Sequence, residues 1–319
     1  MQRYALLLLA ALLGPVVATA QTAAVADHHQ HLFSPALAAV IAAPNTAPHP
    51  IFARDVVALL DSAGIRRGLL LSAAYMYGRP GRNVEDEYAK VRAENDWNAA
   101  QAAEYPGRLR AFCSFNPLKE YALAEVERCE RDPRLRGIKL HIGNSDVQLD
   151  NPQHLEQLRR VFRAADAHRM AVVVHLRASI SRNRPYGPAQ ARLFLDELMP
   201  LVPHVPVQVA HLAGTGPGYD DPRADSAMAV LAEAVARHDP RTRRLWFDVA
   251  SCANGVTPEQ AALLVRRIRQ AGVRRILYGT DAALGDNLRP REAWAAFRRL
   301  PLTEREFRVI ARNVAPYLR

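Results

Sequence analysis

Eight short apolar runs, spaced along almost the whole chain, constrain the fold of this sequence more than any other feature. Most of them are nearly continuous in valine, leucine, isoleucine and alanine, which is typical of parallel strands buried on both faces. The runs are Ala24 to Ala26, Gly68 to Ala74, Leu109 to Phe115, Gly137 to Ile142, Met170 to Leu176, Val205 to Leu212, Leu245 to Ala250 and Arg275 to Gly279. They predict a sheet of parallel strands.

Amphipathic segments between these runs predict helices. They are Ala53 to Ala63, Glu85 to Tyr105, Ala122 to Arg131, His154 to His168, Ala189 to Leu198, Asp225 to His238 and Pro258 to Ala271. Thr257 before Pro258 is a typical helix start, and Gly64 and Gly272 stand where a C-cap is expected. Eight strands that alternate with helices predict the α/β fold class, a closed (β/α)₈ TIM barrel, with residues 21–319 as a single domain.

The first twenty residues predict a signal peptide. Arg3 supplies a positive charge, an apolar run of about ten residues follows, and Ala18-Thr19-Ala20 is a typical cleavage site. That run is too short to span a bilayer, and no later stretch predicts a membrane span. We therefore expect a protein exported with its signal cleaved near Ala20, and periplasmic if its source is a Gram-negative bacterium.

The chain is basic, with a formal net charge of +10 and 42 lysines and arginines, nearly all of them arginine. The arginines are spread over the predicted helices and no basic run is interleaved with aromatic residues, which speaks against a nucleic-acid partner. A solvated arginine-rich surface explains most of the charge, and part of it would favour an anionic small-molecule substrate.

The cysteines, Cys113, Cys129 and Cys252, are odd in number and widely spaced. This pattern argues against a disulfide framework, even in an exported protein. Cys113 lies inside an apolar run, so we expect it to be a buried free cysteine.

Polar residues gather at the ends of the predicted strands. His29 and His31 are two positions apart and share a strand face, whereas His28 points away. His175, His211 and Asp281 end three further strands, and Lys139 and His141 share one face of the fourth. A lone His-x-His pair is explained by a packed polar strand end as well as by a metal site. Several buried imidazoles and a carboxylate need a common partner, however, and together they predict a site for Zn²⁺ or a similar ion.

These segments resemble the amidohydrolase superfamily, and within it the amidohydrolase-related group that includes aminocarboxymuconate-semialdehyde decarboxylase and related lactonases. The matching pieces, in order, are Asp27-His28-His29-Gln30-His31, Gly137-Ile138-Lys139-Leu140-His141, Val174-His175, Ala210-His211-Leu212-Ala213-Gly214 and Tyr278-Gly279-Thr280-Asp281. The resemblance covers essentially the whole chain after the signal. It is specific for fold and metal, and much less so for substrate.

The resemblance implies a role for each matching residue. His29, His31, His175 and Asp281 match the metal ligands, and Asp281 also handles the proton of the water that the metal activates. His211 matches a histidine that acts in acid–base catalysis or polarises the transition state. Since the group's Gly-x-Lys-x-His segment carries an unmodified lysine, we expect one divalent metal, most simply Zn²⁺, rather than two bridged by a carbamylated Lys139. Homodimers are common among similar enzymes.

Substrate contacts are expected from Lys139, His141 and Arg177. Lys139 would hold an anionic group of the substrate or else form a structural ion pair, and Arg177 shares the face of His175. Asp248 would either orient a metal ligand or contact a helix. Residues 214–218 predict a tight turn beside His211, not a phosphate loop.

The sequence therefore predicts a metal-dependent hydrolase that cleaves a C–N or C–O bond, such as an amide or lactone, with metal-activated water. Two alternatives stay open. One is a non-oxidative metal-dependent decarboxylase of an aromatic or enolic acid, and the other is a periplasmic binding protein without catalysis.

Overall fold

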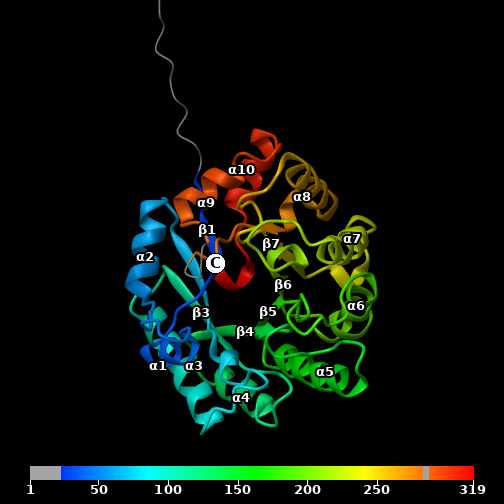
Figure 1. The fold of residues 1–319 in the computed structure, drawn as a ribbon. Helices are drawn as coiled ribbons and strands as arrows, with labels where there is room; N and C mark the ends of the chain where they lie inside the picture. Colours follow the sequence, from blue (N-terminus) through cyan, green and yellow to red (C-terminus); the bar gives the residue numbers. More distant parts are fainter. Residues whose placement is uncertain (1–22, 283–286) are drawn as a thin grey trace, which may run out of the picture.

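The computed structural model describes residues 23–282 and 287–319, so the predicted signal peptide lies outside the described residues. Eight parallel strands form one sheet in the order of the sequence, and helices surround it (Figure 1). The strands are β1 (Ala26–Gln30), β2 (Arg67–Leu71), β3 (Leu109–Ser114), β4 (Leu135–His141), β5 (Ala171–His175), β6 (Val207–Val209), β7 (Leu245–Asp248) and β8 (Ile276–Leu277). The predicted (β/α)₈ barrel is confirmed.

Hydrogen bonds between the first and last strands bring the two edges of the sheet together. The amide of His28 donates to the carbonyl of Tyr278 at 2.9 Å, and the amide of Asp281 donates to the carbonyl of His29 at 2.8 Å. Both residues of the second pair belong to the predicted metal site. Barrel closure therefore also sets the distance between His29 and Asp281.

The predicted helices occur where the amphipathic pattern placed them. Their bounds are α2 (Ala53–Ser62), α3 (Glu87–Ala103), α4 (Ala122–Glu130), α5 (Pro152–Ala167), α6 (Pro188–Leu193, continued by a π-helical turn, Phe194–Leu198), α7 (Pro222–Ala236) and α8 (Pro258–Ala271). The helices α9 (Pro290–Phe297) and α10 (Glu304–Arg312) follow β8. None of the described helices is both long and apolar enough to cross a membrane.

A short helix interrupts the stretch after β1 that we expected to be irregular. This helix, α1 (Pro35–Ile41), begins at Ser34, whose hydroxyl accepts a hydrogen bond from the amide of Leu37. The hydroxyl of Ser34 in turn donates to the carboxylate of Glu94 in α3. A serine cap before a proline at the first helical position is a recognisable start signal, but seven residues are too few for a clear periodicity.

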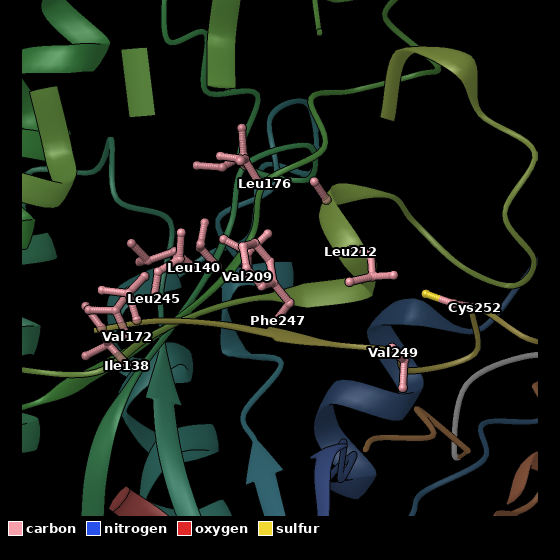
Figure 2. Close-up of a cluster of buried hydrophobic side chains, with 14 of the residues drawn as sticks. Ile138, Leu140, Val172, Leu176, Val209, Leu212, Leu245, Phe247, Val249 and Cys252 are labelled. Carbon is pink, nitrogen blue, oxygen red and sulfur yellow. The ribbon is translucent and has the colours of Figure 1, made fainter. Parts of the chain in front are cut away.

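Alternate side chains of the strands face outward and pack against the helices. In β4 to β7 these are Ile138, Leu140, Val172, Val209, Leu245 and Phe247, all fully buried (Figure 2). Cys113 also faces outward, from β3, and its sulfur forms a disulfide with Cys129 of α4. The expectation of a free Cys113 is therefore wrong: the two residues are far apart in sequence but meet where α4 packs over β3.

The other set of strand side chains faces the barrel interior. An apolar layer there contains Ala26, Leu69, Leu71, Phe112, Ala171 and Val173, together with Leu318. Gly137 makes room for this layer, because a Cβ at that position would lie 2.5 Å from the ring of Phe112. The last described residues thus fill the interior of the barrel at one end, and Figure 1 shows them at the centre of the ring. Polar residues occupy the other end.

Candidate metal centre

His29 and His31 converge as the strand alternation predicted. Nδ1 of His29 lies 3.0 Å from a carboxylate oxygen of Asp248, and Nδ1 of His31 lies 2.6 Å from the carbonyl oxygen of Leu71. Both of these partners can only accept, so each Nδ1 carries the proton and each Nε2 presents a lone pair. The two Nε2 atoms are 3.3 Å apart, which leaves two acceptors facing each other.

His211 adds a third imidazole in the same state. Its Nδ1 lies 2.9 Å from the carbonyl oxygen of Ala250, so its Nε2 also presents a lone pair. The residue does not belong to β6 as predicted. It sits in a short turn, Ala210–Ala213, in which His211, Leu212 and Ala213 all adopt left-handed backbone angles. Such conformations cost about 1–3 kcal/mol each and cluster at functional sites.

Asp281 faces these imidazoles with an unsatisfied oxygen. Its Oδ1 is buried without a hydrogen-bond partner among the described residues, and it lies 3.6 Å from Nε2 of His31. The donor atoms of His29, His211 and Asp281 all lie within 4.8 Å of one another. Burial raises the pKa of Asp281 well above its usual value, although the charge of Lys139 opposes this.

This arrangement fits a divalent cation. Burial lowers the pKa of His29 to about 3 and holds the pKa values of His31 and His211 below their usual range, so all three imidazoles are neutral at pH 7. Two ligands bound tetrahedrally to zinc are separated by about 3.4 Å. The 3.3 Å and 3.6 Å separations around His31 match that spacing. His29, His31, His211 and Asp281 could therefore hold the metal.

His175 and His141 lie beside this group, on neighbouring strands. They are register partners in β4 and β5, and their rings stack with centroids 3.9 Å apart. The ring of His175 is 5.2 Å from that of His211. His175 thus lies beside the candidate metal position, and its role as a metal ligand stays a prediction. His141 is less buried, and its Nδ1 accepts from the amide of Asn144, so its Nε2 can face a bound molecule.

Lys139 is the buried cation of the site. Its Nζ lies 3.5 Å from Nε2 of His29, and its side chain is 1% exposed. Burial lowers the pKa of Lys139 to about 8, while the carboxylates of Asp248 and Asp281 oppose that shift. At pH 7 the lysine remains charged and can attract an anionic group.

Arg177 is already engaged by a protein carboxylate. Its Nε donates to Asp221 at 2.6 Å, and its guanidinium lies over the ring of Tyr186, 4.8 Å from the centroid. Asp221 is also the N-cap of α7. The arginine therefore fixes the loop after β5 to the start of α7, and its contact with substrate stays a prediction.

Two buried carboxylates that are not among the predicted site residues hold the neighbouring parts of the site in place. Asp27 accepts hydrogen bonds from the amide of His29 and from the amide and hydroxyl of Thr280, and so joins β1 to the residue before Asp281. Asp248 holds the ring of His29. Of the two roles considered for Asp248, the structure shows the contact with a candidate ligand.

A cavity of about 700 Å³ is lined by Ala282, which follows Asp281 in the chain, but by none of the candidate metal ligands. It is bounded by the loop and helix that follow β1, including Phe33, Ile41 and His49, and by Asn287, whose side chain donates to the carbonyl of Asp281. Its volume is in the range of small-molecule sites.

Comparisons with known proteins agree with this architecture. A family model described as Amidohydrolase matches residues 26–313. No curated protein is a significant sequence match.

Solved structures with the same fold include two decarboxylases and a hydrolase. The first is 5-carboxyvanillate decarboxylase LigW from Sphingomonas paucimobilis, with TM-score 0.62, 18% identity, and coverage of 90% of this chain and 96% of that one. The second is 2,6-dihydroxybenzoate decarboxylase from Rhizobium, with TM-score 0.63, 17% identity, and coverage of 91% and 96%. The third is a probable 2-pyrone-4,6-dicarboxylic acid hydrolase from Acinetobacter baumannii, with TM-score 0.55, 16% identity, and coverage of 89% and 95%. The match of the family model over nearly the whole barrel shows that the chain belongs to the amidohydrolase family.

Proposed function

We propose that this protein is a metal-dependent hydrolase that cleaves a C–N or C–O bond of a small organic substrate, such as an amide or a lactone. The observation that carries the proposal is the convergence in a buried site of three imidazole lone pairs and Oδ1 of Asp281, which has no hydrogen-bond partner in the part of the chain that the structure describes. A divalent ion such as Zn²⁺ supplies Lewis acidity toward water and a substrate carbonyl when it is bound there.

The protein's own groups supply the proton transfers. Asp281 would accept a proton and return it, because its carboxylate faces the imidazole lone pairs inside the buried site. Nδ1 of His211 donates its proton to Ala250, so the Nε2 lone pair would either bind the metal or take up a proton and return it to the substrate. Lys139 and His141 would hold an anionic part of the substrate, and Arg177 would provide a further contact to it.

A decarboxylase is the second candidate, because decarboxylases of aromatic acids are prominent among the similar structures. The same site would serve that reaction, since loss of CO₂ leaves a carbanion that needs a proton. Asp281, or His211 after its Nε2 has taken up a proton, would deliver it. The buried ammonium of Lys139 would attract the substrate carboxylate in either reaction.

One set of experiments tests both candidates. Metal analysis of purified protein is expected to find about one equivalent of zinc or a similar metal per chain. A screen of lactones, amides and aromatic acids is then run in ¹⁸O-labelled and in deuterated water. Hydrolysis transfers ¹⁸O to the product, whereas decarboxylation releases CO₂ and places deuterium on carbon. Protein that contains no metal, and whose stability chelation leaves unchanged, would refute both candidates.

Export to the periplasm is a further part of the proposal. The Cys113–Cys129 disulfide supports it, because disulfides persist mainly outside the reducing cytosol. Amino-terminal sequencing of the secreted or periplasmic protein is expected to begin near Gln21.

A further inference from the structure

A series of polar side chains, all buried except the half-buried Tyr317, crosses the interior of the barrel and ends on His29. The hydroxyl of Tyr317, in the last described segment, hydrogen-bonds Oε1 of Gln208 in β6. Nε2 of Gln208 donates to Oδ2 of Asp248 at 2.5 Å, and the same oxygen lies 3.0 Å from Nδ1 of His29. Gln208 and Asp248 are fully buried. Four side chains from three strands and the closing segment therefore form one connected column.

The donors and acceptors in this column allow only one arrangement of its hydrogen bonds. When the tyrosine hydroxyl donates to Oε1 of Gln208, the amide nitrogen of Gln208 must face Asp248. The carboxylate of Asp248 can only accept, so His29 must carry its proton on Nδ1. Its Nε2 lone pair then points toward His31 and Asp281. The protonation state that a metal ligand needs is therefore selected by residues that do not touch the candidate metal position.

The second oxygen of Asp248 acts on a different residue of the site. Oδ1 accepts from the amide of His211 at 2.9 Å and from the amide of Ala250 at 3.1 Å. The amide of His211 belongs to the left-handed turn after β6, where φ is 51°. One carboxylate thus orients the ring of His29 and stabilises the strained backbone that presents the ring of His211.

We propose that Asp248, held by Gln208 and Tyr317, is the positioning residue of the metal centre. It sets the tautomer of His29 and the place of His211 together, so that both Nε2 lone pairs face the candidate metal position. The inference rests on the proposed metal site but not on a particular substrate or reaction.

The decisive variant is Asp248→Asn. Its amide can satisfy the backbone donors through Oδ1, but its NH₂ group then faces Nδ1 of His29 and favours the other tautomer, with the proton on Nε2. The Kd of the metal, measured by competition with a chromogenic chelator, is expected to rise about 10- to 100-fold. The visible absorption bands of the Co²⁺-substituted protein are expected to shift, which a purely structural role would not produce.

Matched controls separate positioning from general destabilisation. Glu125 in α4 is another fully buried carboxylate, and it bonds to Asn95 and Arg128 outside the barrel interior. Glu125→Gln is expected to lower thermal stability but to leave the metal Kd and the Co²⁺ spectrum unchanged. Tyr317→Phe is expected to raise the metal Kd about threefold through loss of one hydrogen bond. Its control is Tyr219→Phe, whose hydroxyl contacts Asp225 instead.

A folded Asp248→Asn protein with the wild-type metal Kd and Co²⁺ spectrum would overturn the proposal. If Asp248→Asn does not fold, Tyr317→Phe decides: a raised Kd supports the column, and an unchanged Kd overturns it. A wild-type protein that binds neither Zn²⁺ nor Co²⁺ would overturn the proposed function as well, so the two failures are distinguishable.

Discussion

Gly216 offers a sharp test of how the turn beside His211 is packed. This glycine has a φ of +53°, and a Cβ on it would lie 2.0 Å from Oγ of Ser251 and 3.3 Å from Nδ1 of His211. Gly216→Ala therefore has two costs. The left-handed backbone costs alanine about 1–2 kcal/mol, and the collision with Ser251 adds about 1–3 kcal/mol of overpacking. We expect a total loss of about 2–5 kcal/mol in the free energy of unfolding.

Ser251→Ala separates the two costs. Oγ of Ser251 is buried without a hydrogen-bond partner among the described residues, so its removal alone should change stability little. Without Oγ, the atom of residue 251 that lies nearest to the Cβ added at position 216 is the Cβ of residue 251, at 3.2 Å. In that background Gly216→Ala should retain only the backbone cost of about 1–2 kcal/mol.

Denaturant unfolding of the wild type, both single variants and the double variant gives the coupling energy between the two positions. We expect about 1–3 kcal/mol of rescue. If the two single costs add to within about 0.5 kcal/mol, the collision does not exist and the turn is packed differently.

Three further predictions concern the metal centre and its surroundings. Asp281→Asn should lower kcat/KM on an identified substrate by about 10²- to 10⁴-fold, and turnover equal to wild type would contradict the role given to this carboxylate. Lys139→Met should raise KM for an anionic substrate at least tenfold, and should affect a neutral analogue much less; equal effects on both would argue against charge recognition. Burial lowers the pKa of His28 to about 4, so the unfolded chain binds more protons below pH 6.5. The free energy of unfolding should therefore fall by about 3 kcal/mol between pH 6.5 and 4 on account of this residue. His28→Gln should flatten that slope in pH-dependent denaturation, and an unchanged slope would assign it to other groups.

The ligand residues could be recognised from the sequence because a strand has only two faces. Two histidines at positions i and i+2 must share one of them, and parallel strands bring their carboxyl ends to one rim of the barrel. His29 and His31 therefore meet, and Asp281 reaches them once the eighth strand pairs with the first.

The support around these ligands could not be predicted in the same way. Asp248 reaches His29 across 219 positions in the sequence, and its choice of partner depends on the register with which the barrel closes. The apolar pattern likewise assigns His211 to a strand, because the residue types in Ala210-His211-Leu212 do not favour a left-handed turn. The Cys113–Cys129 pairing was missed because it depends on where one helix packs over one strand.

The way the barrel closes also bears on when the metal site can form. The hydroxyl of Thr280 hydrogen-bonds the carboxylate of Asp27 across 253 positions, and the amide of Ala315 donates to the ring of His28 across 287 positions. Contacts of such high sequence separation form late, since the intervening chain must first be ordered. His29 and His31 therefore cannot be oriented until the residues near 317 have joined the closed barrel. The metal should bind only after that step, and a chain truncated before residue 313 should not retain the ion.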